Sequence, residues 1–385
     1  MTPATRHGLV DATAMPPYDL GEGHPFARDR QEPLFDLIRR MELARSEEFL
    51  TPVAASRDIV ELAHDREYVD MVEATSADNP DPSVRAGGLE FGLGSADNPL
   101  APGQHQAASA VTGATADCVL RVVKGELQHA FNPTGGLHHA AHRTASGFCI
   151  YNDLVAGIRT ARNTGVEKVM YVDFDVHHGD GVEFAFADDP SVLTVSFHQS
   201  PETLFPGTGH EKDVGVGDGK GTVVNMPFAP YTGDDSWWHC VSTVLPAVTR
   251  RFKPDLIVTQ HGCDPHHEDP LAQLMLTTAP MQKAAGLSRD LAMEVCDGRW
   301  VATGGGGYQP YRVLPRAWSI VWMEMNGRQL PERVDPDWLK AWRHASNDPL
   351  PERFIDPELP KSNAVDQARD MNLRRLDKLL KLHDL

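Results

Sequence analysis

Residues 168–181, KVMYVDFDVHHGDG, constrain the fold of this chain more than any other stretch. The first half is an apolar run without Gly or Pro, and its β-branched and aromatic side chains predict a buried strand over residues 169–172. Carboxylates and two adjacent histidines follow where this run ends. Because ligands bind at the carboxyl ends of strands in open α/β sheets, the stretch predicts an α/β fold with a polar site there.

The polar residues of this stretch have the spacing of a metal site. If the extended conformation continues past the apolar run, alternation places Asp173, Asp175 and His177 on one face. A carboxylate and an imidazole two residues apart supply half of a divalent-metal site. The alternative is that Asp173 and Asp175 cap a helix while His177 and His178 are solvated. We favour the metal site because burying these groups unpaired would be costly.

The rest of the chain alternates between predicted strands and helices. Apolar runs predict strands near residues 8–11, 129–132, 191–198, 255–259 and 300–303. Periodicity and capping residues predict helices near 33–43, 59–64, 67–74, 104–124, 152–163, 182–187, 237–252 and 281–296. Residues 76–102 read as a long loop rich in Asn, Asp, Pro and Gly. We therefore expect one α/β fold, a single doubly wound, mostly parallel sheet with helices on both faces.

The charge balance and the cysteines exclude several classes of function. The chain has 36 Lys and Arg against 54 Asp and Glu, a formal net charge of −18. Such a surface repels phosphate backbones, so we expect no direct nucleic-acid partner, and it suits a cationic substrate. No apolar leader and no run of eighteen apolar residues occurs, which predicts a cytoplasmic protein without a membrane partner. The five scattered cysteines form no CxxC pair, so we expect neither a disulfide frame nor a thiolate zinc site.

Unusual polar groups stand at four predicted strand ends: the tandem His138 and His139, the Asp175/His177 cluster, Asp264, and Tyr308 after four glycines. If these ends meet at one edge of the sheet, they make a metal hydrolase site. Asp175, His177 and Asp264 would hold the ion and leave coordination positions open for water and a carbonyl oxygen. His138 or His139 would take a proton from the water. Tyr308 would donate a hydrogen bond to the developing oxyanion.

Six motifs in this order resemble the zinc-dependent histone deacetylase family: GGLHHA, ASGFCIYND, DFDVHHGDG, FPGTG, QHGCD and GGGGY. The segments NPTGGLHH, LFPGTG, DPLAQLMLTT and RWVATGGGGYQPYRVLPRAW are most similar to the bacterial acetoin-utilisation-type branch. The resemblance covers residues 8–342. It implies an arginase/deacetylase-like fold and hydrolysis of N-ε-acetyl or acyl lysine in proteins or peptides.

The resemblance also implies a role for individual residues. Asp175, His177 and Asp264 match the zinc ligands, and Tyr308 matches the oxyanion donor. His139 matches the general base and His138 its electrostatic partner, while Asp173 and Asp180 match the acids that orient this pair. Further matches, by the same resemblance, concern the substrate tunnel and a structural potassium ion. The tunnel set is Phe148, Gly147, Phe205, Leu271 at the rim and Asp97 at the entrance; the potassium set is Asp173, Asp175, His177, Ser196 and the backbone of Phe197.

The chain divides by composition near its C-terminus. We expect a catalytic domain over residues 1–345 and a polar extension over residues 346–385 that ends in a charged helix. Leu373, Leu376 and Leu380 form one stripe of that helix, which we expect to pack back on the domain.

Several alternatives stay open from the sequence. An acetylpolyamine amidohydrolase or a deacylase for longer acyl chains would use the same scaffold, and iron(II) suits the ligand set as zinc does. A dimanganese ureohydrolase is disfavoured because the positions of its bridging acids hold Gly179 and His266. A binding module without catalysis is disfavoured because every catalytic role is filled. The sequence decides neither whether the chain is a homo-oligomer nor whether Arg28 and Arg30, in a predicted loop, are surface or site residues.

Overall fold

The computed structural model describes residues 7–26 and 30–385. Its centre is one eight-stranded sheet in which every strand pair is parallel, in the order β2-β1-β3-β8-β7-β4-β5-β6. The strands are β1 (His7–Val10), β2 (Phe49–Leu50), β3 (His129–Asn132), β4 (Val169–Asp173), β5 (Val192–Ser196), β6 (Val223–Asn225), β7 (Leu256–Gln260) and β8 (Trp300–Thr303).

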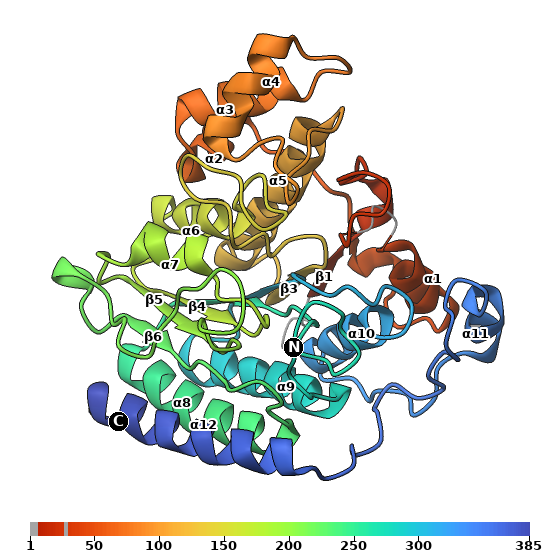
Figure 1. The fold of residues 1–385 in the computed structure, drawn as a ribbon, viewed down its shortest axis with the longest axis vertical. Helices are drawn as coiled ribbons and strands as arrows, with labels where there is room; N and C mark the ends of the chain where they lie inside the picture. Colours follow the sequence, from red (N-terminus) through yellow and green to blue (C-terminus); the bar gives the residue numbers. More distant parts are fainter. Residues whose placement is uncertain (1–6, 27–29) are drawn as a thin grey trace.

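Helices cover both faces of this sheet (Figure 1). They are α1 (Glu32–Arg40), α2 (Arg57–Ala63), α3 (Arg66–Thr75), α4 (Pro82–Gly88), α5 (Gln104–Val123), α6 (Asp153–Asn163), α7 (Asp180–Phe186), α8 (Asp234–Phe252), α9 (Thr278–Val295), α10 (Leu314–Met325), α11 (Pro336–Trp342) and α12 (Asn363–Leu382). Met170 and Val172 of β4 join a core with α8, α9 and α10, whereas Val169 and Tyr171 join one with α5, α6 and α7. The predicted doubly wound α/β fold is confirmed.

The position of β4 in the middle of the sheet explains why this strand is apolar up to its last residue. It is buried along its whole length between β5 and β7, so both of its faces meet helices, as parallel sheets require. Asp173, its last residue, lies in register with Ser196 of β5 and Gln260 of β7. Gln260 in turn lies in register with Thr303 of β8. The segments that follow these strands therefore start side by side at one edge of the sheet.

Two predictions of local structure need correction. Residues 76–102 are not a loop throughout, because Pro82 stands in the first turn of α4 and a 3₁₀ turn follows at Leu89–Phe91. In α12, Leu376 is buried as predicted, but Leu373 is 40% exposed. The buried positions beside Leu376 are Asn372 and Leu379. Asn372 is buried because its side chain forms hydrogen bonds with Ala229 and Thr232, which precede α8. The helix packs against α8, as expected.

The sequence prediction did not include β2, β6, α10 or α11; both strands have three residues or fewer and carry almost no periodic signal. None of the described helices is both long and apolar enough to cross a lipid bilayer. All five cysteines are buried and none is in a disulfide.

Candidate metal centre and active site

Three candidate metal ligands meet where β4 and β7 end. Asp175 and His177 follow β4, and Asp264 follows β7, its neighbour in the sheet. All three are buried, and their ligand atoms lie within 4.8 Å of one another. Nδ1 of His177 is 3.1 Å from Oδ1 of Asp175 and 3.1 Å from Oδ2 of Asp264. Two carboxylates and one imidazole are a donor set that zinc(II) and iron(II) accept.

The electrostatics of these residues fit a bound cation. Burial and the charge of Asp175 raise the pKa of Asp264 to about 6. Two carboxylates this close and this deeply buried repel each other unless positive charge compensates them. The residues present therefore fit a divalent ion held by Asp175, His177 and Asp264.

Side-chain turns, rather than extended alternation, bring Asp175 and His177 to the cluster. The strand ends at Asp173, whose Oδ1 accepts from the backbone N of Asp175 at 3.1 Å. Oδ1 of Asp175 accepts from the backbone N of His177 at 3.0 Å. The prediction that these residues share one face of an extended strand is therefore wrong, because consecutive Asx turns redirect the chain.

Besides the backbone N of His177, three donors fix the carboxylates of the cluster. Oδ2 of Asp175 accepts from Nε2 of Gln260 at 2.6 Å and from the backbone N of Gly306 at 2.7 Å. Oδ1 of Asp264 accepts from the backbone N of Val176 at 2.9 Å. A Cβ on Gly306 would stand 2.7 Å from Cγ of Asp264. Glycine is therefore needed here so that the backbone can lie close to the carboxylates, rather than to allow a turn.

The tandem histidines lie beside the cluster, and each is held by an acid. Nδ1 of His138 is 2.8 Å from Oδ2 of Asp173, and Nδ1 of His139 is 2.7 Å from Oδ1 of Asp180. Oδ2 of Asp173 also accepts from the hydroxyl of Tyr171 at 2.6 Å. The two Nε2 atoms of the histidines are 3.0 Å apart.

The environments of the two histidines push their pKa values apart. Burial lowers the pKa of His138, but the charges of Asp173 and Asp175 outweigh it and raise the value to about 9. Burial and the neighbouring His138 lower the pKa of His139 to about 4. The pKa of His138 is therefore shifted upward and that of His139 downward, and such a divergence is typical of a pair that divides acid and base roles within a site.

Tyr308 completes the polar part of the site. Burial, followed by the charges of Asp264 and Asp175, raises the pKa of Tyr308 well above its ordinary value, so its hydroxyl stays a donor. Its backbone N donates to Oδ2 of Asp269 at 2.8 Å, and its ring lies 5.8 Å from the ring of Phe148.

The candidate tunnel residues lie around the approach to the histidines. The ring of Phe205, 44% exposed, is 4.9 Å from the ring of His139. Gly147 has φ +50°, and a Cβ there would stand 2.8 Å from Cγ of His139 and 2.9 Å from Phe205. Phe148 packs edge-on against the ring of His24 at 4.6 Å. Phe205 and Gly147 therefore lie against His139, and Phe148 lies between His24 and Tyr308.

The remaining candidates lie in the loop after β7, in the loop before α5 and at the end of β5. Leu271 is partly buried, and its backbone N donates to Oδ1 of Asp269 at 3.0 Å. Asp97 is exposed on the loop before α5, and its charge acts on His24. Of the potassium candidates, Ser196 is hydrogen-bonded through Oγ to His198 at 2.8 Å, and the backbone N of Phe197 donates to the carbonyl of Asp173 at 3.0 Å.

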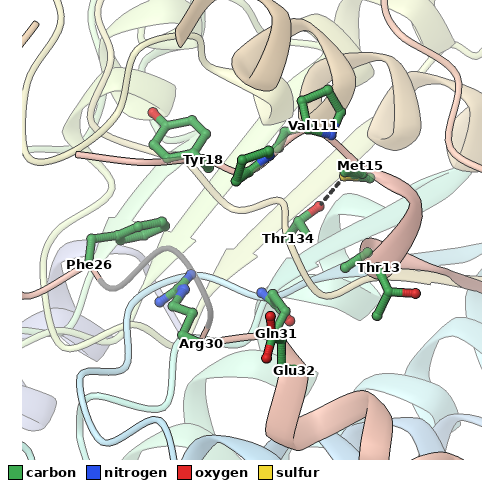
Figure 2. A pocket seen from close by; sticks show the side chains of 12 residues that line it. Thr13, Met15, Tyr18, Phe26, Arg30, Gln31, Glu32, Val111 and Thr134 are labelled. Atoms are coloured by element: carbon green, nitrogen blue, oxygen red, sulfur yellow. Dashed lines mark hydrogen bonds between the residues drawn. The ribbon is translucent and has the colours of Figure 1, made fainter. Parts of the chain in front are cut away.

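Sequence reasoning missed Gln260 and Asp269 and left Arg30 undecided; Arg28 is outside the described residues. Arg30 is only 3% exposed and donates to the carbonyl oxygens of Gly305, at 2.8 Å, and Gly307, at 3.3 Å. It forms one wall of a cavity of about 170 Å³ between the N-terminal loop and α5, which Figure 2 shows with Tyr18 and Phe26. A lone arginine in a Gly/Pro-rich loop gives no sequence signal for this position.

Comparison with known proteins decides the family. The profile described as "Histone deacetylase domain" matches residues 24–325. The chain belongs to the histone deacetylase family. The resemblance inferred from its motifs is thereby confirmed, and its activity class is that of the deacetylase hydrolases.

The relatives include bacterial proteins of one type. The acetoin utilization protein AcuC of Bacillus subtilis (strain 168) is 38% identical over 340 residues, covering 88% of this chain and 87% of that protein. AcuC of Staphylococcus aureus (strain MRSA252) is 32% identical over 342 residues, with 88% and 87% covered.

Solved structures confirm the arginase/deacetylase-like fold. An HDAC homolog complexed with SAHA has a TM-score of 0.86 at 29% identity and covers 97% of this chain and 100% of that chain. An HDAC homolog from Aquifex aeolicus has a TM-score of 0.85 at 29% identity, with 96% and 100% covered.

Proposed function

We propose that this deacetylase hydrolyses the N-ε-acyl amide of acylated lysine in proteins or peptides and, for the acetyl group, releases acetate and free lysine. One observation carries the proposal. His138 and His139, each held at Nδ1 by an acid, stand 3.0 Å apart between their Nε2 atoms, beside the buried cluster of Asp175, His177 and Asp264. The pKa of His139 is shifted downward and that of His138 upward, so the site brings a candidate base, a candidate positive charge and a metal-ligand set together.

Zinc(II) is the ion we propose for Asp175, His177 and Asp264, and iron(II) is the second candidate. When bound, the ion would act as a Lewis acid on the amide carbonyl and favour deprotonation of a water molecule. We also propose that a potassium ion has a structural role near Asp173, Asp175, His177, Ser196 and the backbone of Phe197.

The side chains of the chain itself would move the protons. Nδ1 of His139 is engaged by Asp180, so the proton of the attacking water would go to Nε2, the atom that lies 3.0 Å from Nε2 of His138. The water oxygen bonds to the amide carbon and the π pair of the carbonyl moves onto its oxygen as an oxyanion. When this tetrahedral species collapses, the carbon–nitrogen bond breaks and the proton on His139 passes to the leaving lysine nitrogen. His138, held by Asp173, keeps its charge and stabilises the negative charge that develops. Tyr308 donates its hydroxyl proton in a hydrogen bond to the oxyanion.

An aromatic slot would take the methylene stem of the lysine. Phe148 and Phe205 would form its walls, and Gly147 keeps the space beside His139 free of a side chain. Leu271 would form the rim, and Asp97 would bind the substrate backbone at the entrance. The net charge of −18 favours cationic lysine-rich partners over nucleic acid.

We further propose that residues 1–345 are the catalytic domain, that residues 346–385 are an extension of it, and that the protein works in the bacterial cytoplasm. The bacterial relatives and the reduced state of the five buried cysteines support this placement.

A substrate panel tests the function. Zinc-loaded protein would be assayed with acetyl-, propionyl-, butyryl- and octanoyl-lysine peptides and with acetylputrescine, and Tyr308→Phe would be the matched variant. We expect turnover of an acyl-lysine peptide in the wild type, and a loss of about 10²- to 10³-fold in kcat in the variant with zinc retained. Faster turnover of acetylputrescine would assign the chain to the polyamine amidohydrolases, and full activity of Tyr308→Phe would refute the mechanism.

A further inference from the structure

The C-terminal segment, residues 346–385, lies beyond the stretch that the family profile matches, which ends at residue 325. It crosses the molecule from α11 and then runs as α12 along α8, at the bottom of Figure 1. Its side chains reach two loops at the edge of the sheet where the site is built. Asp356 reaches the loop after β7, and Arg375 reaches the loop after β5.

Asp356 is the first of these two anchors. Its Oδ2 accepts from Nε2 of His266 at 2.9 Å and from the backbone N of Thr278 at 3.1 Å. Its Oδ1 accepts from Nη1 of Arg316 at 2.7 Å. The side chains of His266 and Arg316 are 0% and 1% exposed, and that of Asp356 is 11% exposed. With the hydroxyl of Thr278, which donates to Oδ2 at 3.0 Å, this largely buried carboxylate has four donors, and such hydrogen bonds are strong where water is excluded.

His266 passes this constraint to the active site through the backbone. It stands two residues after Asp264, and its carbonyl oxygen accepts from the backbone N of Asp269 at 2.9 Å. The carboxylate of Asp269 accepts from the backbone N of Tyr308 at 2.8 Å and from that of Leu271 at 3.0 Å. The turn at residues 264–271 therefore links Asp264, a metal-ligand candidate, with Tyr308, the proposed oxyanion donor, and with Leu271 at the proposed tunnel rim. Asp356 binds this turn at His266.

Arg375 is the second anchor, on the buried side of α12. Its Nη2 donates to Oγ of Ser200 at 3.0 Å, and its Nη1 donates to a backbone carbonyl two residues after β6 at 3.1 Å. One turn further along the helix, Lys378 pairs with Glu211. Residues 199–211 form the loop that carries Phe205 at its tip. The helix therefore holds both ends of the loop that supplies one tunnel wall.

We infer that the C-terminal segment is a working part of the active site, in which Asp356 positions the turn of Asp264 and Tyr308 and Arg375 positions the wall of Phe205. The inference rests on the proposed function for its kinetic consequences. Neither residue reaches the substrate or the ion, so both are positioning residues. The two residues should have different kinetic effects. Loss of the Asp356 carboxylate should disturb metal binding and the chemical step, whereas loss of the Arg375 guanidinium should disturb binding of the acyl-lysine stem.

The test uses full-length protein and three matched variants. Asp356→Asn keeps the shape of the side chain but replaces one acceptor oxygen with a donor, and Arg375→Gln removes the guanidinium. Arg369→Gln is the control, because Arg369 lies on the same helix, is 50% exposed and pairs only with exposed acids among the described residues. Zinc affinity would be measured by chelator competition, kcat and KM with an acetyl-lysine peptide, and amide exchange of residues 199–211, 262–271 and 304–310 by mass spectrometry.

We expect Asp356→Asn to lower zinc affinity and kcat by about ten-fold or more and to speed exchange in 262–271 and 304–310. We expect Arg375→Gln to raise KM several-fold, with zinc affinity and kcat within about two-fold of the wild type, and to speed exchange in 199–211 alone. Arg369→Gln should match the wild type in every measurement. If Asp356→Asn does not fold, His266→Phe replaces it, since it removes the Nε2 donor while keeping a ring that can stack on His267.

Two outcomes would overturn the inference. One is unchanged zinc affinity, kinetics and exchange in both anchor variants. The other is a uniform loss of thermal stability in which the folded fraction keeps wild-type kcat, KM and zinc affinity. Failure of the proposed function would look different, because the wild type would then not hydrolyse any acyl-lysine peptide while the shifts in zinc affinity and exchange would still appear.

Discussion

Substitution of Gly306 by alanine isolates one steric contact at the metal centre. The φ angle of Gly306 is not in the left-handed region, unlike those of Gly305 at +148° and Gly307 at +143°, so alanine adds no backbone strain there. The new Cβ would nevertheless overlap Oδ2 of Asp264, its nearest neighbour, and stand 2.7 Å from Cγ of that residue and 2.9 Å from Oδ2 of Asp175. The three nearest atoms among the described residues all belong to the two carboxylates that we propose as ligands.

The size of the effect follows from these distances. Ordinary Cβ contacts begin at 3.4 Å, and Oδ2 of Asp264 lies even closer to the new Cβ than Cγ does, so this carboxylate has to retreat by at least about 0.7 Å. Zinc–oxygen bonds tolerate deviations of only about 0.2 Å, so this displacement removes or badly weakens one of three protein ligands. We therefore expect zinc affinity to fall by at least about 100-fold and turnover to fall at least as far.

The assay compares Gly306→Ala with Gly286→Ala. Gly286 lies inside α9, where a new Cβ meets only the end of the Glu324 side chain at 3.3 Å, so that variant should keep zinc and activity. Zinc content after dialysis, zinc affinity by chelator competition and kcat with an acetyl-lysine peptide would be measured for both. A Gly306→Ala protein that is folded, binds zinc as the wild type does and turns over within two-fold would refute this placement of Asp264 and Asp175.

Three further predictions concern the histidine base, a buried histidine and the C-terminal helix. Asp180→Asn removes the charge that holds Nδ1 of His139 at 2.7 Å, so kcat should fall by about 10²-fold or more with zinc affinity unchanged; kinetics of the zinc-loaded variant check this, and a normal kcat would contradict it. Burial lowers the pKa of His64 to about 3 from 6.5, so the unfolded chain binds a proton that the folded chain excludes, and stability present above pH 6.5 is lost as the pH falls toward 3. Denaturant unfolding at pH 8 and pH 5 should show the wild type losing about 2 kcal/mol more than His64→Gln, and equal losses would contradict the assignment. Leu376→Ala should lower the free energy of unfolding by about 2–4 kcal/mol because the side chain is 4% exposed, whereas Leu373→Ala, 40% exposed, should change it by less than about 0.5 kcal/mol; similar values for the two would mean that α12 packs by another face.

The strands and helices that could be predicted are those whose own local sequence carries the signal. The apolar run of β4 marks a strand buried on both faces, and Asn152 marks the start of α6, where its side chain accepts from the backbone N of Val155. The stripe of α12 was predicted less well, because Asn372 has three hydrogen-bonding partners around the start of α8 and takes a position that hydrophobic periodicity gives to an apolar residue. Contacts across the fold overrode the local pattern there.

The candidate site likewise contains residues that the local sequence predicts and residues that it does not. His138, His139, Asp175 and His177 stand in dense polar clusters after predicted strands, so their gathering at one sheet edge could be expected. Gln260, Asp269, Arg30 and Asp356 could not be found, since each is a common residue type whose importance comes from a partner far away in the sequence. The distance from Asp356 to His266 spans 90 positions, and the hydrogen bond between them has no counterpart in local composition.

Metal titration tests the central claim most directly. Chelator-treated protein would be supplied with zinc from zero to three equivalents per chain, and turnover of an acetyl-lysine peptide would be followed, with Asp264→Asn as the control. We expect activity to rise linearly and reach its plateau at one equivalent, and the variant to stay inactive over this range. Full turnover without metal, or a plateau reached only at two ions per chain, would contradict a single catalytic ion held by Asp175, His177 and Asp264.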